Sequence, residues 1–112
     1  MGMDAWIMAD KDDLHYEIAE LRNYEELNNW MCSLWALKND AYPWDANCKL
    51  LELSPYMMQE TLGWLRPHLD KCKDTNLDEE EREMWTDTTK ALFSAAHASM
   101  EGDWTISYYV WW

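Results

Sequence analysis

Carboxylates are the most abundant residues in this sequence that could do chemistry: 22 Asp and Glu stand beside three His and three Cys. Residues 10–15 (Asp-Lys-Asp-Asp-Leu-His) faintly resemble the opening of a calcium-binding loop. The match fails because Leu14 occupies the position of an oxygen ligand and Leu21 the position of the bidentate Glu. His68 and Cys72 could share a helix face, but a structural zinc site needs four ligands. We therefore expect no metal and no other cofactor.

Motifs for catalysis are missing from the sequence. With three glycines in 112 residues, the chain cannot assemble a glycine-rich loop that cradles a phosphate. No serine stands in a nucleophile elbow, and the three histidines are scattered along the chain. Paired carboxylates can do acid–base work, but among 22 such residues the proximity of two is uninformative. The sequence favours a protein that is not an enzyme, and a small enzyme is the third of our hypotheses.

The net charge of −13 is the strongest signal for function. A net charge of magnitude roughly 2–8 is enough to keep a small domain soluble, and a larger excess destabilises the compact state through self-repulsion. Such a surface repels nucleic acid and anionic lipid and attracts basic protein surfaces. We therefore expect no direct nucleic-acid partner and no membrane. The expected partner is a basic protein surface, that of a nucleic-acid-processing enzyme.

The acidic residues fall into clusters that could imitate a nucleic acid. Asp10, Asp13, Glu17 and Glu20 recur at i, i+3, i+7 and i+10, which predicts one stripe along a helix. At a rise of about 1.5 Å per residue, charges on that stripe repeat about every 4.5–6 Å, against a phosphate about every 3.4 Å per DNA strand. The predicted partner-binding surface also includes Glu25, Glu26, Asp78, Glu79, Glu80, Glu81 and Glu83.

These clusters also have an interpretation that involves no partner. Acidic residues in the first turn of a helix interact favourably with its macrodipole, which alone accounts for much of the cluster at 78–81. A charged stripe opposite an apolar face is what any solvated helix shows. The case for binding therefore depends on the charge of the whole chain, which few Lys and Arg compensate.

Nine tryptophans are more than a core of this size can hide. Five of them, Trp6, Trp30, Trp35, Trp64 and Trp85, stand at positions that suit a core. The other candidates are exposed and complete the predicted partner-binding set, because Trp and Tyr are enriched at interface hot spots: they are Trp44 in a Pro-containing loop, Trp111 and Trp112. The alternative is a terminal strand that folds back on the core.

Hydrophobic spacing predicts about four helices. Leu14, Ile18 and Leu21 recur at helical spacing after Asp10, and a second helix is expected from an Asn23 cap to about Lys38. A loop follows over 39–47, and Ser54-Pro55 starts a third helix that ends at Pro67. After a polar connection over 72–76, the fourth helix begins at an Asn76 cap and stops at Gly102.

Residues 104–112 alternate with the period of a β-strand. One isolated strand is unstable, so we expect it to pair with residues 5–8, with residues 49–53, or with both. The predicted fold is mainly α, with about four helices and a small two- or three-stranded β-sheet that involves the C-terminal strand. An all-α fold with an aromatic tail is the alternative.

The length of 112 residues suits a single domain over 1–112. Three cysteines without a close pair, Cys32, Cys48 and Cys72, are typical of a reducing compartment. The first ten residues lack the basic region of a secretory signal, and no apolar run approaches the roughly 20 residues of a membrane span. We expect a cytoplasmic protein, in the host cell cytoplasm if it is phage-encoded.

In size, charge and lack of a catalytic motif, the chain resembles in general character the small acidic inhibitor proteins. These are phage anti-CRISPR and anti-restriction proteins and the immunity proteins that neutralise nucleases. The likeness implies an inhibitor that occupies the basic nucleic-acid-binding surface of a nuclease or of a CRISPR- or restriction-type effector, as a nucleic-acid mimic. The alternative is a structural or assembly protein that homodimerises through its aromatic C-terminal strand, because exposed strand edges invite pairing.

Overall fold

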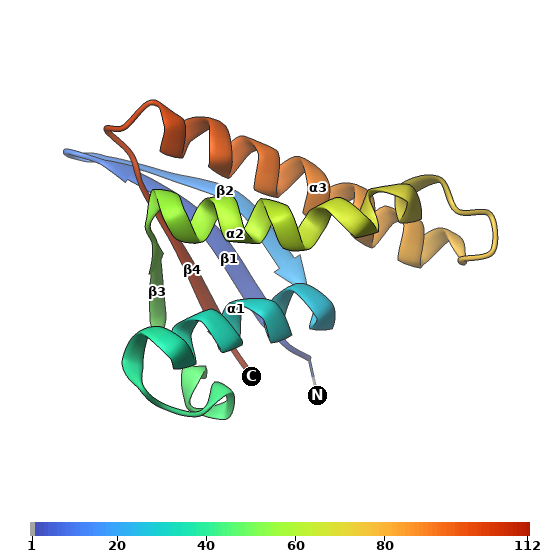
Figure 1. The fold of residues 1–112 in the computed structure, drawn as a ribbon, viewed down its shortest axis with the longest axis horizontal. Coiled ribbons are helices and arrows are strands. Elements are labelled where there is room, and N and C mark those ends of the chain that lie inside the picture. Colours follow the sequence, from blue (N-terminus) through green and yellow to red (C-terminus); the bar gives the residue numbers. More distant parts are fainter. Residues whose placement is uncertain (1) are drawn as a thin grey trace.

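The computed structural model describes residues 2–112, which form four β-strands and three α-helices (Figure 1). In chain order these are β1 (Asp4–Lys11), β2 (Leu14–Arg22), α1 (Glu25–Asn39), β3 (Leu50–Leu53), α2 (Pro55–Leu65), α3 (Glu79–Met100) and β4 (Thr105–Trp111). Two 3₁₀ segments, η1 (Pro43–Ala46) and η2 (Arg66–Lys73), connect α1 to β3 and α2 to α3.

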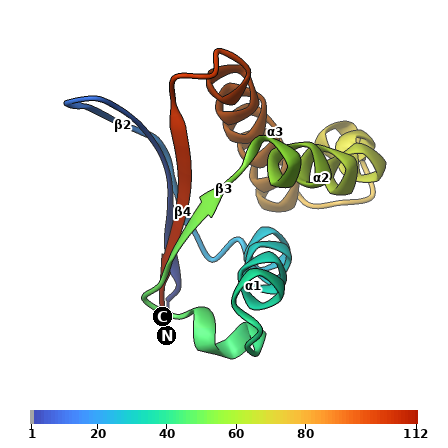
Figure 2. The ribbon, with the colours of Figure 1, turned by 60° about the vertical axis from the view of Figure 1, so that its left-hand side comes forward.

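The four strands form one antiparallel sheet in the order β2-β1-β4-β3. All three α-helices lie on the same side of this sheet, so residues 2–112 form two layers and place no helix on the other sheet face (Figure 2). The helix α3 packs against β1, β2 and β4, and α2 packs against α3 and β3. The prediction of a mainly α fold with a two- or three-stranded sheet is therefore wrong, and so is its all-α alternative.

The main error concerns residues 10–22, which form a β-hairpin instead of a helix. Lys11 pairs with Leu14, so Asp12 and Asp13 make a two-residue turn. Asp12 adopts a positive φ of 52°, a conformation that Asp tolerates better than most residues and that tight hairpin turns require. The acidic stripe of Asp10, Asp13, Glu17 and Glu20 at helical spacing consequently does not exist.

A β-bulge explains why the hairpin has the spacing of a helix. Ile7 pairs with Ala19 but Met8 pairs with Glu17, which leaves Ile18 as an extra residue in β2. The extra residue shifts the in–out alternation of β2 by one position. Leu14, Ile18 and Leu21 of β2 therefore stand four and three positions apart, which is also the spacing of an amphipathic helix.

The helix starts were predicted in part. Ser54 caps α2, and its Oγ accepts a hydrogen bond from the Met57 N–H at 3.2 Å. Asn23 does not cap α1; it has a φ of 62°, and its Oδ1 accepts from the Met3 N–H at 2.8 Å. Asp78, not Asn76, caps α3.

The core lies between the sheet and the helices. Ala5, Ile7 and Ala9 of β1 are buried there, as are Ile106, Tyr108 and Val110 of β4. The predicted C-terminal strand is confirmed, and it lies inside the sheet because β1 and β3 pair with its two edges. Of the five tryptophans expected in the core, Trp85 is buried, and Trp30, Trp35 and Trp64 are partly buried against it. Trp6 instead lies on the helix-free sheet face, opposite Tyr109.

Candidate functional site

An acidic cleft of about 580 Å³ lies between the edge strand β2 and the first turns of α3. Six acidic residues line it, one from β2 and five from the start of α3. They are Glu20, Asp78, Glu80, Glu81, Glu83 and Asp87. Arg22, Asn23, Tyr24 and Met84 complete the lining. The cleft thus combines five of the sequence-predicted acidic residues with several that the sequence did not indicate.

The amphipathic pattern of α3 positions most of these carboxylates. Asp78 Oδ1 accepts a hydrogen bond from the Glu81 N–H at 2.8 Å, which fixes the start of the helix. Glu80, Glu83 and Asp87 then recur at i, i+3 and i+7 and share one face. The opposite face is held in the core by the buried residues Trp85, Thr88 and Leu92, which have the same spacing. Because the core fixes α3, the carboxylate face has a fixed orientation.

Tyr24 reports the electrostatic field in the cleft. Its hydroxyl donates a hydrogen bond to Asp87 Oδ2 at 3.0 Å. The pKa of Tyr24 is raised to about 12, first by burial and then by the hydrogen bond to Asp87 and the negative charges of Asp87 and Glu83. The phenol therefore stays protonated and contributes no charge of its own at neutral pH.

The negative charge of the cleft carboxylates is not neutralised by nearby basic side chains. Among the described residues that line it, Arg22 is the only basic one, and the Arg22 Nε lies 3.1 Å from Asp4 Oδ1, outside the cleft. Within residues 2–112, none of the six cleft carboxylates forms an ion pair. The cleft is thus a concentrated, unneutralised anionic surface, and it is open to solvent because all six residues are exposed.

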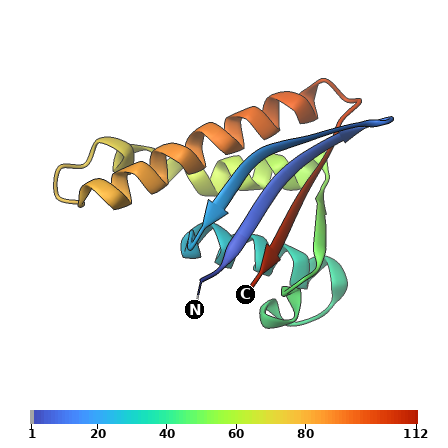
Figure 3. The same ribbon diagram turned by 180° about the vertical axis from the view of Figure 1, so that it is seen from behind.

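The other predicted acidic residues lie elsewhere. Asp10 and Asp13 are at the tip of the β1–β2 hairpin, at the opposite end of the long axis from the start of α3 (Figures 1 and 3). Asp10 Oδ1 contacts His15 Nδ1 at 2.6 Å. Glu17 pairs with Met8 on β1. The acidic residues at the hairpin tip are consequently separate from those at the start of α3.

Three further predicted residues have local partners or line other hollows. Glu26 Oε2 lies 3.9 Å from Lys71 Nζ. Glu79 lines a hollow beside the cleft together with Arg82 and Lys90. Glu25, at the start of α1, lines a different pocket, which also contains two of the predicted tryptophans.

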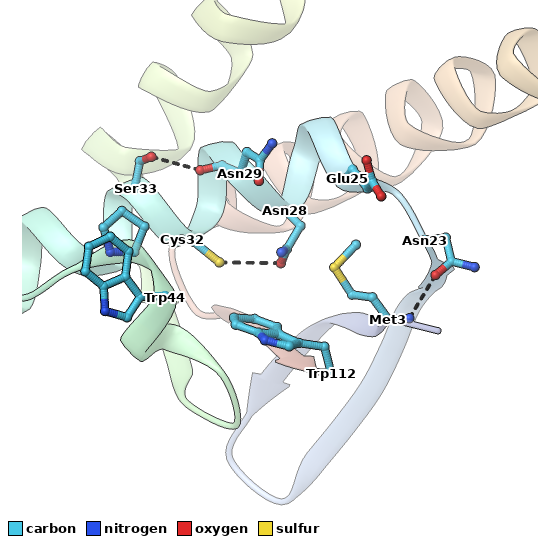
Figure 4. A pocket seen from close by; sticks show the side chains of 10 residues that line it. Met3, Asn23, Glu25, Asn28, Asn29, Cys32, Ser33, Trp44 and Trp112 are labelled. Carbon is cyan, nitrogen blue, oxygen red and sulfur yellow. Dashed lines mark hydrogen bonds between the residues drawn. The ribbon is translucent and has the colours of Figure 1, made fainter. Parts of the chain in front are cut away.

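That second pocket has a volume of about 600 Å³ and lies between α1, η1 and the two chain ends (Figure 4). Trp44 lies at one end of the pocket and Trp112 at its base. Glu25 and Asn23 lie at the other end, and Asn28 and Cys32 of α1 form its inner wall. The sequence predicted these tryptophans as exposed, and their side chains are 67% and 40% exposed.

The helix-free sheet face is a third surface with exposed aromatic residues. The rings of Trp6 and Tyr109 lie 5.9 Å apart on neighbouring strands, and Tyr109 pairs with Leu50 on its other side. Leu50 and Trp111 are each 52% exposed. The two edge strands of the sheet add acidic residues: Glu17 of β2 pairs with Met8, and Glu52 of β3 pairs with Ser107.

A cluster of aromatic rings holds His68 against α3. The rings of His68 and Trp85 stack with centroids 4.6 Å apart, and Lys71 Nζ lies 4.7 Å from the Trp85 ring centroid. The pKa of His68 is lowered, first by burial and then by the charge of Lys71, while Glu26 acts in the opposite direction. Among residues 2–112, no three His, Cys, Asp or Glu side chains are placed to hold a metal ion.

Comparison with protein-family models, with curated proteins and with solved structures finds no match for this chain. Over the part of the chain that the structure describes, no helix has both the length and the apolar character needed to cross a membrane. The interpretation of function therefore depends on the surfaces described above.

Proposed function

We propose that the protein is a small acidic inhibitor that acts stoichiometrically on a nuclease or a CRISPR- or restriction-type effector. Its acidic cleft would occupy the basic surface that normally binds nucleic acid. The observation that supports this proposal most strongly is the set of six cleft carboxylates without a compensating cation. Such an arrangement destabilises the folded chain by self-repulsion and attracts a basic partner.

The cleft has the physical properties of a phosphate mimic. Carboxylates three and four residues apart on a helix have Cβ atoms about 5–6 Å apart, close enough for one Arg-rich surface to contact several of them. Arg forms bidentate hydrogen bonds with carboxylates as it does with phosphates. Because the core fixes α3, the partner would bind a preformed surface and spend little free energy on ordering it.

A panel of purified nucleases and of CRISPR- and restriction-type effectors tests the proposal. Each is immobilised, and the binding of this protein is measured between roughly 50 and 200 mM salt. We expect at least one member to bind, with an affinity that falls as salt rises. Affinity that does not depend on salt, or binding by no basic member of the panel, contradicts the proposal.

A matched pair of variants assigns the binding to the cleft. The cleft variant carries Glu80→Gln, Glu81→Gln and Glu83→Gln. The control variant carries Asp40→Asn, Glu60→Gln and Asp70→Asn, which changes the net charge by the same three units at exposed sites outside the cleft. We expect the cleft variant to lose affinity and the control to keep most of it. An equal loss in both would show that net charge alone drives binding.

A homodimer is the second candidate, and the helix-free sheet face favours it. Both edges of β4 are already paired, so a dimer cannot form by edge pairing of this strand. Its outward residues Tyr109 and Trp111 could instead pack face to face with those of a second copy. Salt would strengthen such a dimer by screening the repulsion between two acidic chains, whereas salt weakens binding to a basic partner. Light scattering after size exclusion at low and high salt distinguishes the two candidates.

A further inference from the structure

The pocket between α1 and η1 has the dimensions of a ligand site. Its volume of about 600 Å³ falls within the roughly 300–1,000 Å³ that is common for small-ligand pockets. Met3, Pro43, Trp44 and Trp112 supply its apolar surface. This pocket adjoins the acidic cleft at Asn23, which lines both, but none of the six cleft carboxylates lines it.

The aromatic residues of the pocket are held in place before any ligand binds. The ring of Trp44 stacks on that of Tyr42, with centroids 4.6 Å apart and an interplanar angle of 5°. The Trp112 backbone is held by Asn47 through two hydrogen bonds. The Trp112 N–H donates to Asn47 Oδ1 at 2.9 Å, and Asn47 Nδ2 donates to the Trp112 carbonyl at 3.0 Å. Aromatic surfaces fixed in this way bind at a lower entropic cost.

The polar side of the pocket selects for positive charge. Among the described residues that line it, Glu25 is the only charged one, and no Lys, Arg or His is present. Asn28 Oδ1 already accepts from the Tyr108 hydroxyl at 2.7 Å and from Cys32 Sγ at 3.6 Å. The Ser33 hydroxyl donates to the Asn29 carbonyl at 2.8 Å. The Glu25 carboxylate is therefore the strongest acceptor in the pocket.

We propose that this pocket binds an arginine side chain. The aliphatic stem would lie on Trp112 and Met3, and the guanidinium would reach the Glu25 carboxylate. Guanidinium is preferred over ammonium because it is planar, more weakly hydrated and stacks on indole faces. The arginine either belongs to the basic partner, a source that rests on the proposed function, or is the free amino acid. Both sources share the same chemistry.

Indole N–H resonances in a ¹H–¹⁵N NMR spectrum measure binding to the pocket directly. The probe is N-acetyl-arginine methylamide, and the control is the citrulline analogue, which has nearly the same shape but no charge. We expect the arginine probe to shift the Trp44 and Trp112 resonances and to leave Trp6 unshifted. The citrulline analogue should bind about tenfold more weakly, and Glu25→Gln should weaken the arginine probe by a similar factor.

Several outcomes would overturn the proposal. Equal affinity for the citrulline analogue would show that the pocket does not select for charge. An unchanged affinity in Glu25→Gln would remove the assigned acceptor. Shifts at Trp6 without shifts at Trp44 and Trp112 would place the probe on the sheet face. Glu25 is exposed at the start of α1, so this variant should fold, and the unaffected indole resonances verify that.

The same variants separate this proposal from the proposed function and identify the source of the arginine. The triple cleft variant should bind the arginine probe as the unmodified protein does, even if it no longer binds an effector. Trp112→Ala removes the indole on which the aliphatic stem would lie and should weaken the probe about tenfold. If Trp112→Ala also weakens effector binding, the arginine belongs to the partner. If effector binding is unchanged while the probe is lost, the ligand is free arginine.

Discussion

Neutralising Glu83 should stabilise the protein. Glu83 is the fifth residue of α3, beyond the first turn in which the macrodipole favours a negative charge. It has like-charged neighbours at i−4, i−3 and i+4, namely Glu79, Glu80 and Asp87. Each like-charge pair at such spacing costs about 0.2–0.5 kcal/mol. Three pairs predict that Glu83→Gln raises the free energy of unfolding by about 0.6–1.5 kcal/mol, since Gln and Glu have similar helix propensities.

The matched control is Glu80→Gln, one turn nearer the helix start. Glu80 is the second residue of α3, where its charge gains about 0.3–1 kcal/mol from the macrodipole. It has one like-charged neighbour at this spacing on the helix, Glu83. The gain from the macrodipole equals or exceeds the repulsion from Glu83. Glu80→Gln should therefore leave the free energy of unfolding unchanged or lower it. The two variants have the same net charge and differ only in position.

Urea unfolding followed by tryptophan fluorescence measures both variants without adding ions. We expect the Glu83→Gln midpoint to rise at low salt with an unchanged m-value, and the gain to shrink in molar NaCl because screening weakens the repulsion. A lower midpoint for Glu83→Gln, or a gain that salt does not reduce, would refute the reasoning. A stabilising variant that also loses effector binding would show that the charge is retained for function at a cost in stability.

Three further predictions concern individual groups of the fold. The pKa of Tyr24 is raised to about 12. The stability contributed by its neutral form is therefore complete below the unfolded pKa of about 10 and is lost as pH rises through about 12. In a spectrophotometric titration, Asp87→Asn should lower this pKa. The pKa of His68 is lowered. The stability contributed by its neutral form is therefore present above about pH 6.5 and is lost as pH falls through the lower native pKa. Between pH 7 and pH 5, the urea midpoint of His68→Gln should therefore decline less than that of the unmodified protein. Asp78→Ala should cost about 1 kcal/mol in urea unfolding because it removes the α3 cap, whereas Asn76→Ala should cost clearly less, and equal costs would contradict the assigned cap.

The sequence predicted the elements whose signals are local. The Ser54-Pro55 start of α2 and the alternation over 104–112 follow from neighbouring residues, and both were confirmed. The hairpin was missed because the bulge at Ile18 imitates a helical period. The expected pairing of the C-terminal strand with residues 5–8 and 49–53 is confirmed, and the sheet gains its unpredicted fourth strand from the missed hairpin.

The candidate site was predictable in composition but not in geometry. The carboxylates at 78–83 were recognised from charge alone. Their meeting with Glu20 requires β2 to be the edge strand beside α3, which no local pattern indicates. Tyr24 and Asp87 were missed because they are 63 residues apart and neither belongs to a motif. Asp87 does continue the i+4 spacing from Glu83, a signal that could have extended the predicted cluster by one residue.

Displacement of DNA from a bound effector tests the central claim most directly. A fluorescently labelled duplex is bound to an effector that the panel identifies, and this protein is titrated in while anisotropy is followed. We predict that the duplex is released at about one protein per effector, that the control variant does the same, and that the triple cleft variant needs at least about tenfold more protein. A duplex that stays bound while the protein binds the effector, or an equal loss of potency in both variants, would contradict the account.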